Sequence, residues 1–263
     1  MMQRRSFMAL AGSCLVCGCA GAVHRLPEVN YGDIATAQTE VGMTPPPQRR
    51  PVSDDEVART LRNAIQLVRA PAAHLCHEMD VGVCDWRFQL SRSREMNAGA
   101  TGYGQIVLNR GIVEYAANEE EVCMVVAHEI GHHAANHVAR GVRNQMIGAL
   151  IGVAVIGIAG AVAGSAPTSE TAQMAAKLGG RIGHLSFSKE QEREADYLAA
   201  AILYRAGIDL DKARGLLLSM AAGSHQMATT FLDTHPAGPE RVAAWDRAVA
   251  EIRAARGRLP PRA

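Results

Sequence analysis

The sequence predicts an α+β fold that is mostly helical, with a small β-sheet packed beside one helix. Several stretches repeat apolar side chains at helical spacing and begin at capping residues, near positions 53, 118, 188, 210 and 239. Only two stretches, 81–90 and 105–108, have the composition of strands, and the second follows the glycine-rich turn GATGYG. The 263 residues suffice for one sizeable core with appendages.

A metal-binding helix is predicted at 122–140, which reads VCMVVAHEIGHHAANHVAR. His128 and His132 are four residues apart and share one helix face, so their imidazoles can hold one metal ion. Glu129, beside the first histidine, is placed to take a proton from a water molecule at that metal. The alternative is a polar helix face with unrelated histidines, and a second motif argues against it.

This second motif is Glu192-Arg-Glu-Ala-Asp196, on a helix predicted to begin near Lys189. A catalytic zinc takes three protein ligands and keeps one position open, so two histidines require one ligand more. Glu192 supplies that carboxylate. Asp196, one turn later, suits a hydrogen-bond acceptor for a ligand imidazole. We interpret Glu190 and Glu194 as solvated charges on the helix face, although Glu194 is a serious competitor of Glu192.

With both motifs the chain resembles the CAAX-prenyl-protease/HtpX/Oma-type family of gluzincin zinc metallopeptidases, in particular its short bacterial periplasmic lipoprotein members. The resemblance covers roughly 53–253 and includes MNAGATGYGQIVLNRGIVEYAANEEEV and DTHPAGPERVAAW on either side of the two motifs. It implies a zinc-metallopeptidase core with a small sheet beside the HExxH helix. The strand QIVLNRG departs from the family, where it is often more aromatic, so the shape of the substrate subsites stays open.

The resemblance also implies roles for the residues of the two motifs. His128, His132 and Glu192 would bind Zn2+, one ion per chain. Glu129 would be the general base. Asp196 would hold a ligand imidazole from behind.

A C-terminal His-Pro…Arg pattern of the family matches His235 and Arg241. His235 would donate to the oxyanion, occupy the fourth zinc position in the resting enzyme, or simply cap a turn, and these alternatives stay open. Arg241 would stabilise the oxyanion or pair with an acidic neighbour. We interpret His133, His137 and His184 as structural.

The resemblance further implies that substrate binds along 97–108. Asn97 and Ala98 match the family's Asn-Ala stretch before a strand that pairs with extended substrate. Such pairing reads the peptide backbone with little selectivity for side chains. Tyr103 either contacts substrate or is a simple turn aromatic.

Residues 1–19 are predicted to be a signal peptide with a lipobox, because a basic start precedes a short apolar run and small residues. A twin-arginine signal and an ordinary Sec signal fit equally well. In VCGC at 16–19, Cys19 would be the lipidated first residue of the mature chain, with Cys14 as the weaker rival and cleavage without lipid as the alternative. We therefore expect the periplasmic face of a bacterial membrane, the outer rather than the inner one because Ala20 is neutral.

Three of the six cysteines lie outside that signal. Cys76 and Cys84 bracket a short segment and could form a disulfide in an oxidising compartment, a question that the sequence leaves open. Cys123 sits among apolar residues of the metal helix and is predicted to be a buried free thiol.

The domain organisation follows from composition. Residues 20–52 are predicted to be a flexible tether, because they contain TPPPQRRP and little hydrophobic periodicity. The metallopeptidase domain would span 53–256, with a first helix that ends at Pro71. Residues 257–263 are predicted to be a frayed tail.

The apolar stretch 146–164, MIGALIGVAVIGIAGAVAG, is nearly long enough to cross a hydrocarbon core of about 30 Å. A single crossing would place His128 and His132 on the opposite side from Glu192, which zinc bonds of about 2 Å forbid. We predict a mobile apolar lid or hairpin over the cleft that touches lipid or unfolded substrate. A buried core helix is the alternative.

The net charge of +1, without a basic run, gives no argument for nucleic-acid binding. We therefore predict an exported zinc endopeptidase of periplasmic quality control, which hydrolyses peptide bonds of unfolded or misassembled cell-envelope proteins, the substrate class implied by the resemblance. Its other partner would be the membrane, through the lipid and 146–164. The alternative function is a non-catalytic periplasmic chaperone or assembly factor with a structural zinc, against which Glu129 argues.

Overall fold

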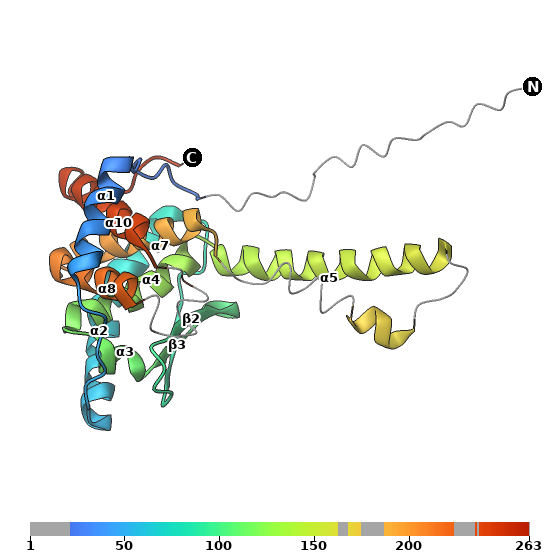
Figure 1. Ribbon diagram of the computed structural model, residues 1–263, viewed down its shortest axis with the longest axis horizontal. Coiled ribbons are helices and arrows are strands. Elements are labelled where there is room, and N and C mark those ends of the chain that lie inside the picture. The colour runs from blue at the N-terminus through green and yellow to red at the C-terminus, as the bar shows by residue number, and fades with distance from the viewer. Residues whose placement is uncertain (1–21, 163–167, 175–186, 224–234, 236, 263) are drawn as a thin grey trace, which may run out of the picture.

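The computed structural model describes residues 22–162, 168–174, 187–223, 235 and 237–262. This part is mostly helical with one three-stranded sheet, which confirms the predicted fold class (Figure 1). The elements in chain order are α1 (Tyr31–Met43), α2 (Asp54–Met79), β1 (Arg87–Ser91), β2 (Ala98–Thr101), the 3₁₀ turn η1 (Gly102–Gly104), β3 (Gln105–Asn109), α3 (Gly111–Tyr115), α4 (Glu119–Ala134), α5 (His137–Val162), α7 (Lys189–Arg205), α8 (Leu210–Gly223) and α10 (Pro239–Ala254).

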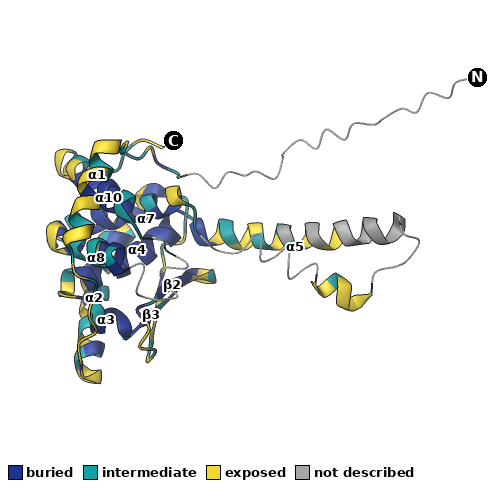
Figure 2. Ribbon diagram, in the orientation of Figure 1, coloured by how far each residue is buried: buried dark blue, intermediate teal, exposed yellow. Residues whose placement is uncertain are grey.

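Helix α4, which carries His128, Glu129 and His132, lies at the centre of the fold. It packs against α2, α7, α8 and β2, and every residue from Glu121 to Ala134 is buried (Figure 2). Its N-terminus is capped by Asn118, whose side chain accepts the backbone N–H of Glu121. Polar groups on such a helix cannot reach water, so each needs a partner inside the protein.

The sheet has the order β1-β3-β2, with β3 parallel to β1 and antiparallel to β2. Strand β3 confirms the prediction at 105–108, whereas β1 occupies only the end of the stretch predicted at 81–90. Strand β2 takes residues that the sequence indicated as a turn. It packs beside α4, and among the described residues it pairs with β3 alone, so it is an edge strand.

Helix α7 brings the second motif against α4. Its N-terminus has the capping box expected from the sequence, formed by Ser188 and Gln191. Gly131 permits a close approach, because a Cβ at this position would lie 3.0 Å from the carbonyl oxygen of Ala195. The glycine between the two motif histidines therefore lets α7 approach near enough for its carboxylates to reach them.

Helix α2 is longer than predicted. Pro71 does not end it, and the helix continues to Met79. Its buried apolar stripe continues through Ala72, Leu75 and Cys76, so packing outweighs the lost backbone hydrogen bond. Cys76 forms a disulfide with Cys84 and fastens the end of the helix to the segment before β1.

The prediction of a flexible tether at 20–52 is wrong for α1. Asn30 and Asp33 form a capping box at its N-terminus, and the helix packs against α8 and α10. Ile34 and Val41 pack against the core, and ion pairs join Arg247 to Asp33 and Arg214 to Glu40 at the surface. Only Ala37 of this helix is buried, which explains why its hydrophobic pattern is too weak to read from the sequence.

The prediction of a frayed tail at 257–263 is also wrong for the described residues up to 262. Leu259 packs against the core. The carbonyl of Pro261 accepts the backbone N–H of Arg25, and His24 forms an isolated bridge with Arg262. The two ends of the described chain therefore pair with each other.

Residues 146–162 do not form a hairpin over a cleft, because they continue helix α5, which projects away from the rest of the domain (Figure 1). No proline interrupts it, and glycine weakens a helix without blocking its hydrogen bonds. Met146, Leu150 and Val153 are exposed, so it is not a core helix either. Residues 163 and 164 lie outside the described residues.

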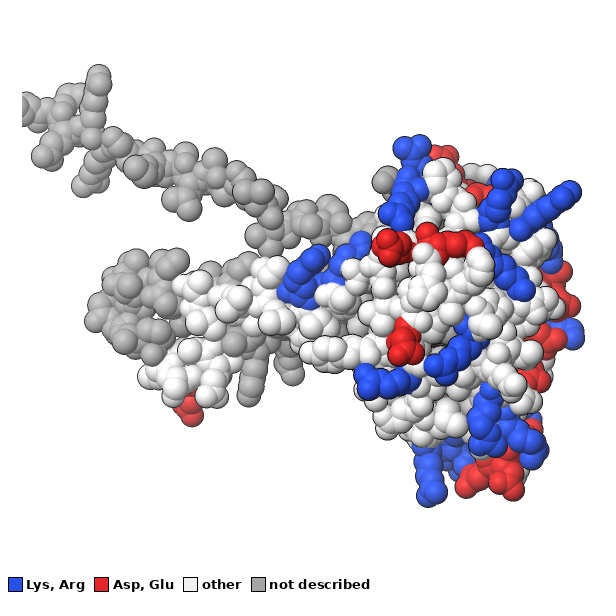
Figure 3. All heavy atoms as spheres, turned by 180° about the vertical axis from the view of Figure 1, so that it is seen from behind, with Lys and Arg blue, Asp and Glu red and all other residues white. Residues whose placement is uncertain are grey.

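The described helices include none that is both long enough and apolar enough to cross a bilayer. On the face shown in Figure 3, acidic and basic side chains are interspersed over the body, whereas the described part of the projection is largely uncharged.

The burial of Cys123 gives a first prediction. Burial, with Glu119 and Glu120 nearby, raises the pKa of its thiol to about 12, so at pH 8 only roughly 10⁻⁴ of it is thiolate. Iodoacetamide should leave the Cys123 peptide unmodified in the native chain and alkylate it fully in denaturant, as peptide mapping would show. Rapid alkylation of the native chain would contradict the buried position.

Candidate metal centre

Four buried side chains from three parts of the chain converge on one point. His128 and His132 come from α4, Glu192 from α7, and His235 from the segment before α10. One nitrogen or oxygen of each lies within 4.8 Å of all the others. This set of nitrogen and oxygen donors suits zinc.

Distances among the three expected ligands fit a tetrahedral ion. The Nε2 atoms of His128 and His132 are 3.1 Å apart, and those atoms lie 3.5 Å and 3.3 Å from the carboxylate oxygens of Glu192. Metal bonds of about 2.1 Å place neighbouring tetrahedral ligands about 3.4 Å apart. Nδ1 of His235 lies 3.2 Å from Nε2 of His128 and 2.9 Å from Oε1 of Glu192, near a fourth corner.

The ring of His128 is held from behind by a buried ion pair. Its Nδ1 lies 2.8 Å from Oδ1 of Asp196. Arg241 donates from Nε and Nη2 to the two oxygens of Asp196, both at 2.8 Å, and its Nη1 lies 2.9 Å from Oε2 of Glu192. A ligand imidazole in this position keeps its proton on Nδ1 and presents the lone pair of Nε2.

The surroundings favour the protonation states that a metal requires. Burial would raise the pKa of the Glu192 carboxyl, but the positive charge of Arg241 and the nearby His235 hold it well below its usual range. Burial lowers the pKa of His132 well below its ordinary value and outweighs the opposing effect of Glu192. The carboxylate is therefore ionised and the imidazole neutral.

Glu129 is fully buried beside this cluster. Neither of its oxygens accepts a hydrogen bond from the described part of the chain, and Nε2 of His235 lies 3.6 Å from Oε1. A buried carboxylate whose oxygens accept no hydrogen bond is costly, so the position indicates a partner that arrives with a metal or a substrate.

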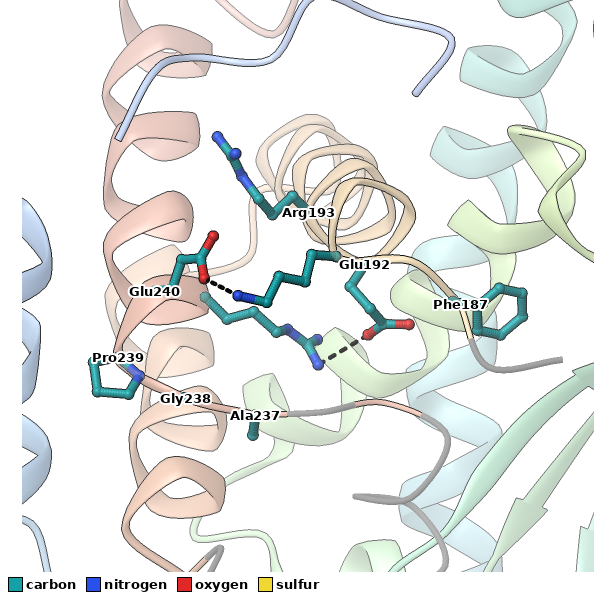
Figure 4. A pocket seen from close by; sticks show the side chains of 9 residues that line it. Phe187, Glu192, Arg193, Ala237, Gly238, Pro239 and Glu240 are labelled. Atoms are coloured by element: carbon teal, nitrogen blue, oxygen red, sulfur yellow. Dashed lines mark hydrogen bonds and ion pairs between the residues drawn. The ribbon is translucent and has the colours of Figure 1, made fainter. Parts of the chain in front are cut away.

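A cavity of about 250 Å³ opens beside Glu192. Figure 4 shows the carboxylate of Glu192 pointing into it from α7, with the segment Ala237–Pro239 across from it. Lys189 and Glu240 form an ion pair of 2.7 Å along its wall. The cavity gives a molecule from outside a place next to the proposed ligand.

Comparison with known proteins agrees with this geometry. The model of Peptidase family M48 matches residues 57–249 of the chain, which include both motifs. The chain belongs to peptidase family M48. Members of this family are zinc metallopeptidases, and His128, His132, Glu192 and His235 form a group that could hold such a metal.

One relative within reach of sequence comparison comes from Vibrio cholerae serotype O1 and is named "Putative beta-barrel assembly-enhancing protease". It is 28% identical over 242 residues, which are 87% of this chain and 49% of the relative. The M48 chain thus spans about half the length of that protein.

One buried group of the M48 site was misjudged from the sequence. Glu194 is not a solvated charge: it is fully buried, whereas Glu190 is exposed as expected. His137 is buried, and its Nδ1 lies 3.1 Å from Nδ1 of His132. Phe187, which the sequence did not single out, stacks on the His132 ring with centroids 3.7 Å apart. His137 follows His132 by five residues, and this short interval is the sequence feature that could have indicated their contact.

The residues predicted to bind substrate lie around the edge strand. Ala98 begins β2, and the carbonyl of Asn97 just before it accepts the backbone N–H of Asn109. Tyr103 lies in η1 with a φ of 60° and is 93% exposed. Cys19 and His184 lie outside the described residues.

The Asp196–Arg241 pair gives a second prediction. Substituting Arg241→Ala leaves two buried carboxylates without their cation, so the free energy of unfolding should fall by about 3–5 kcal/mol. Urea denaturation of the metal-free chain measures it. Arg247→Ala on the same helix removes the exposed pair with Asp33 and should change little. Equal effects of the two substitutions would contradict the pairing.

Proposed function

We propose that this metallopeptidase is a zinc-dependent endopeptidase that acts on unfolded or misassembled proteins of the cell envelope. The observation that carries the proposal is the buried Glu129 carboxylate, without a hydrogen-bond partner among the described residues, beside two histidines and a glutamate at tetrahedral spacing. A closed structural metal site needs no such carboxylate.

We assign the metal to His128, His132 and Glu192. Zinc bound there would polarise the scissile carbonyl and lower the pKa of a water molecule to about 7. The protein's own contribution is to keep the ligands rigid. Asp196 and Arg241 fix the ring of His128, and the close packing of α4 on α7 fixes its distance from Glu192.

Glu129 acts as the general base in this scheme. Its carboxylate takes a proton from the attacking water and delivers it to the leaving amine. Burial shields it from bulk water, and Nε2 of His235 lies 3.6 Å from its Oε1.

The positions of His235 and Arg241 favour some of the roles considered for them. Nδ1 of His235 lies near the fourth corner of the ligand set, which supports a resting fourth ligand that moves aside for substrate. Arg241 directs its guanidinium to Asp196 and Glu192, which supports a positioning role over direct contact with the oxyanion.

The edge strand β2 supports an extended polypeptide as substrate. It packs beside α4, and a strand added to its outer edge would run along the metal helix. Such pairing requires an unfolded segment, and this favours misassembled over folded proteins. The name of the Vibrio relative refers to β-barrel assembly, which supports the envelope as the place of action.

Export and lipidation at Cys19 belong to the same proposal. The Cys76–Cys84 disulfide supports an oxidising compartment such as the periplasm. We place the protein at the periplasmic face of the membrane, with its lipid and the apolar α5 as the parts that face the bilayer.

Glu129→Gln tests the catalytic proposal. The change removes the base but keeps the shape, so the rate of casein degradation should fall by about 10²–10⁴-fold while bound zinc stays stoichiometric. Chelation should abolish the activity of the wild type, and added zinc should restore it. The exposed Glu190→Gln serves as the matched control and should keep full activity.

Equal proteolysis by the wild type and the Glu129→Gln variant would sink the enzyme proposal. Rescue of a deletion strain by both forms alike would instead favour the chaperone or assembly factor with a structural zinc.

Cys19→Ala tests the membrane proposal. Loss of the lipidated cysteine should move the protein from the membrane pellet to the soluble periplasmic fraction, because acyl chains supply the binding energy. Cell fractionation with immunoblotting measures the shift, and Cys14→Ala is the control. A Cys19→Ala protein that still sediments with membranes would show that another part of the chain binds them.

A further inference from the structure

A second buried carboxylate lies next to the metal centre, and the N-terminal segment binds it. Oε2 of Glu194 accepts the backbone N–H of Val23 at 2.8 Å, and Oε1 accepts the N–H of His24 at 2.9 Å. Nδ1 of His24 lies 2.8 Å from Oε1, and Nε2 of His137 lies 3.0 Å from Oε2. All three side chains are at most 4% exposed.

These contacts fix the direction of each hydrogen bond. An ionised carboxylate only accepts, so His24 donates from Nδ1 and His137 donates from Nε2. A neutral His137 then presents the lone pair of Nδ1, 3.1 Å from Nδ1 of His132. His132 donates to it and keeps the lone pair of its Nε2 for the metal.

The two histidines of the metal helix are thus supported in parallel from α7. Asp196 holds His128 directly. Glu194 holds His132 through His137. The two carboxylates differ in their other hydrogen-bond donors. Asp196 accepts from Arg241 of α10, whereas Glu194 accepts from the backbone of Val23 and His24 in the N-terminal segment.

The N-terminal segment is fixed in place by neighbours on both sides. Arg193 donates to the carbonyl of Pro27 at 2.7 Å. The backbone N–H of Arg25 donates to the carbonyl of Pro261 at 3.1 Å. His24 itself is 4% exposed, so its contact with Glu194 is a buried one and not a surface encounter.

We propose that His24 is a positioning residue of the metal centre, which acts through Glu194 and His137 to orient the ligand His132. The inference rests on the metal role proposed for His132. It makes the N-terminal segment, which the sequence indicates as a tether, part of the machinery that binds zinc.

The test is the zinc affinity of the purified full chain, measured by competition with a chromophoric chelator. His24→Ala should weaken zinc binding by about 10-fold, and Glu194→Gln by up to about 100-fold, as is usual for groups that orient ligands. His24→Asn keeps a donor close to the position of Nδ1 and should restore most of the affinity. His74→Ala removes an exposed His–Glu pair of the same 2.8 Å length and should leave the affinity unchanged.

Thermal unfolding separates positioning from plain structural support. A structural defect lowers the melting temperature of the metal-free and the zinc-loaded chain alike, whereas a weaker site reduces the increase that zinc brings. We expect His24→Ala to reduce that increase and His24→Asn to recover it. If His24→Ala does not fold, the zinc affinities of His24→Asn and Glu194→Gln are compared with that of the wild type. The proposal then requires an affinity near the wild-type value for His24→Asn and a weaker one for Glu194→Gln.

Zinc affinity of His24→Ala within about twofold of the wild type would overturn the positioning role and leave the proposed peptidase untouched. Wild-type protein that binds no zinc would overturn both. Equally weak binding by His24→Ala and His24→Asn, with the melting temperature of the metal-free chain lowered in both, would also contradict the proposal.

Discussion

Packing of α4 against α7 buries a group of charged and imidazole side chains in the core, and the rest of the site depends on how they are paired. Glu192 and Asp196 share the guanidinium of Arg241, and each imidazole of the metal helix has a partner behind it. Without these partners the same burial would cost several kcal/mol per charge. The same ion pairs and hydrogen bonds therefore both orient the residues of the metal site and stabilise the core.

The side chains that meet at the candidate metal centre could be selected from the sequence because local geometry brings each pair together. His128 and His132 lie one helical turn apart, as do Glu192 and Asp196, and that spacing places each pair on one face whatever the tertiary structure. The starts of α7 and α10 follow local rules too, because the Ser188–Gln191 capping box spans three residues and Pro239 favours the first position of a helix. Most of the helical fold follows from such short-range rules.

What the sequence could not show depends on contacts between distant residues. Glu194 is two positions from Glu192 and points off the face shared with Asp196, so it looks solvated until the segment around His24, 170 residues earlier, covers it. Helix α1 buries only Ala37 fully, Ile34 and Val41 pack against the core from partly exposed positions, and ion pairs link the helix to α8 and α10. For α5, glycines suggested a hairpin, yet no residue in it breaks the backbone ladder.

The contact between the N-terminal segment and Glu194 also limits how far the domain could lie from a lipid anchor at Cys19. The backbone N–H of Val23 donates to Glu194 beside the metal centre, and Val23 is the fourth residue after Cys19 in the sequence. A fully extended chain spans about 3.6 Å per residue, so in the proposed lipoprotein four residue steps would give the anchor a reach of at most about 14 Å from Val23. A lipid on Cys19 would therefore hold the folded domain close to the membrane surface. In the proposed lipoprotein, the side of the domain that carries residue 22 would then face the bilayer.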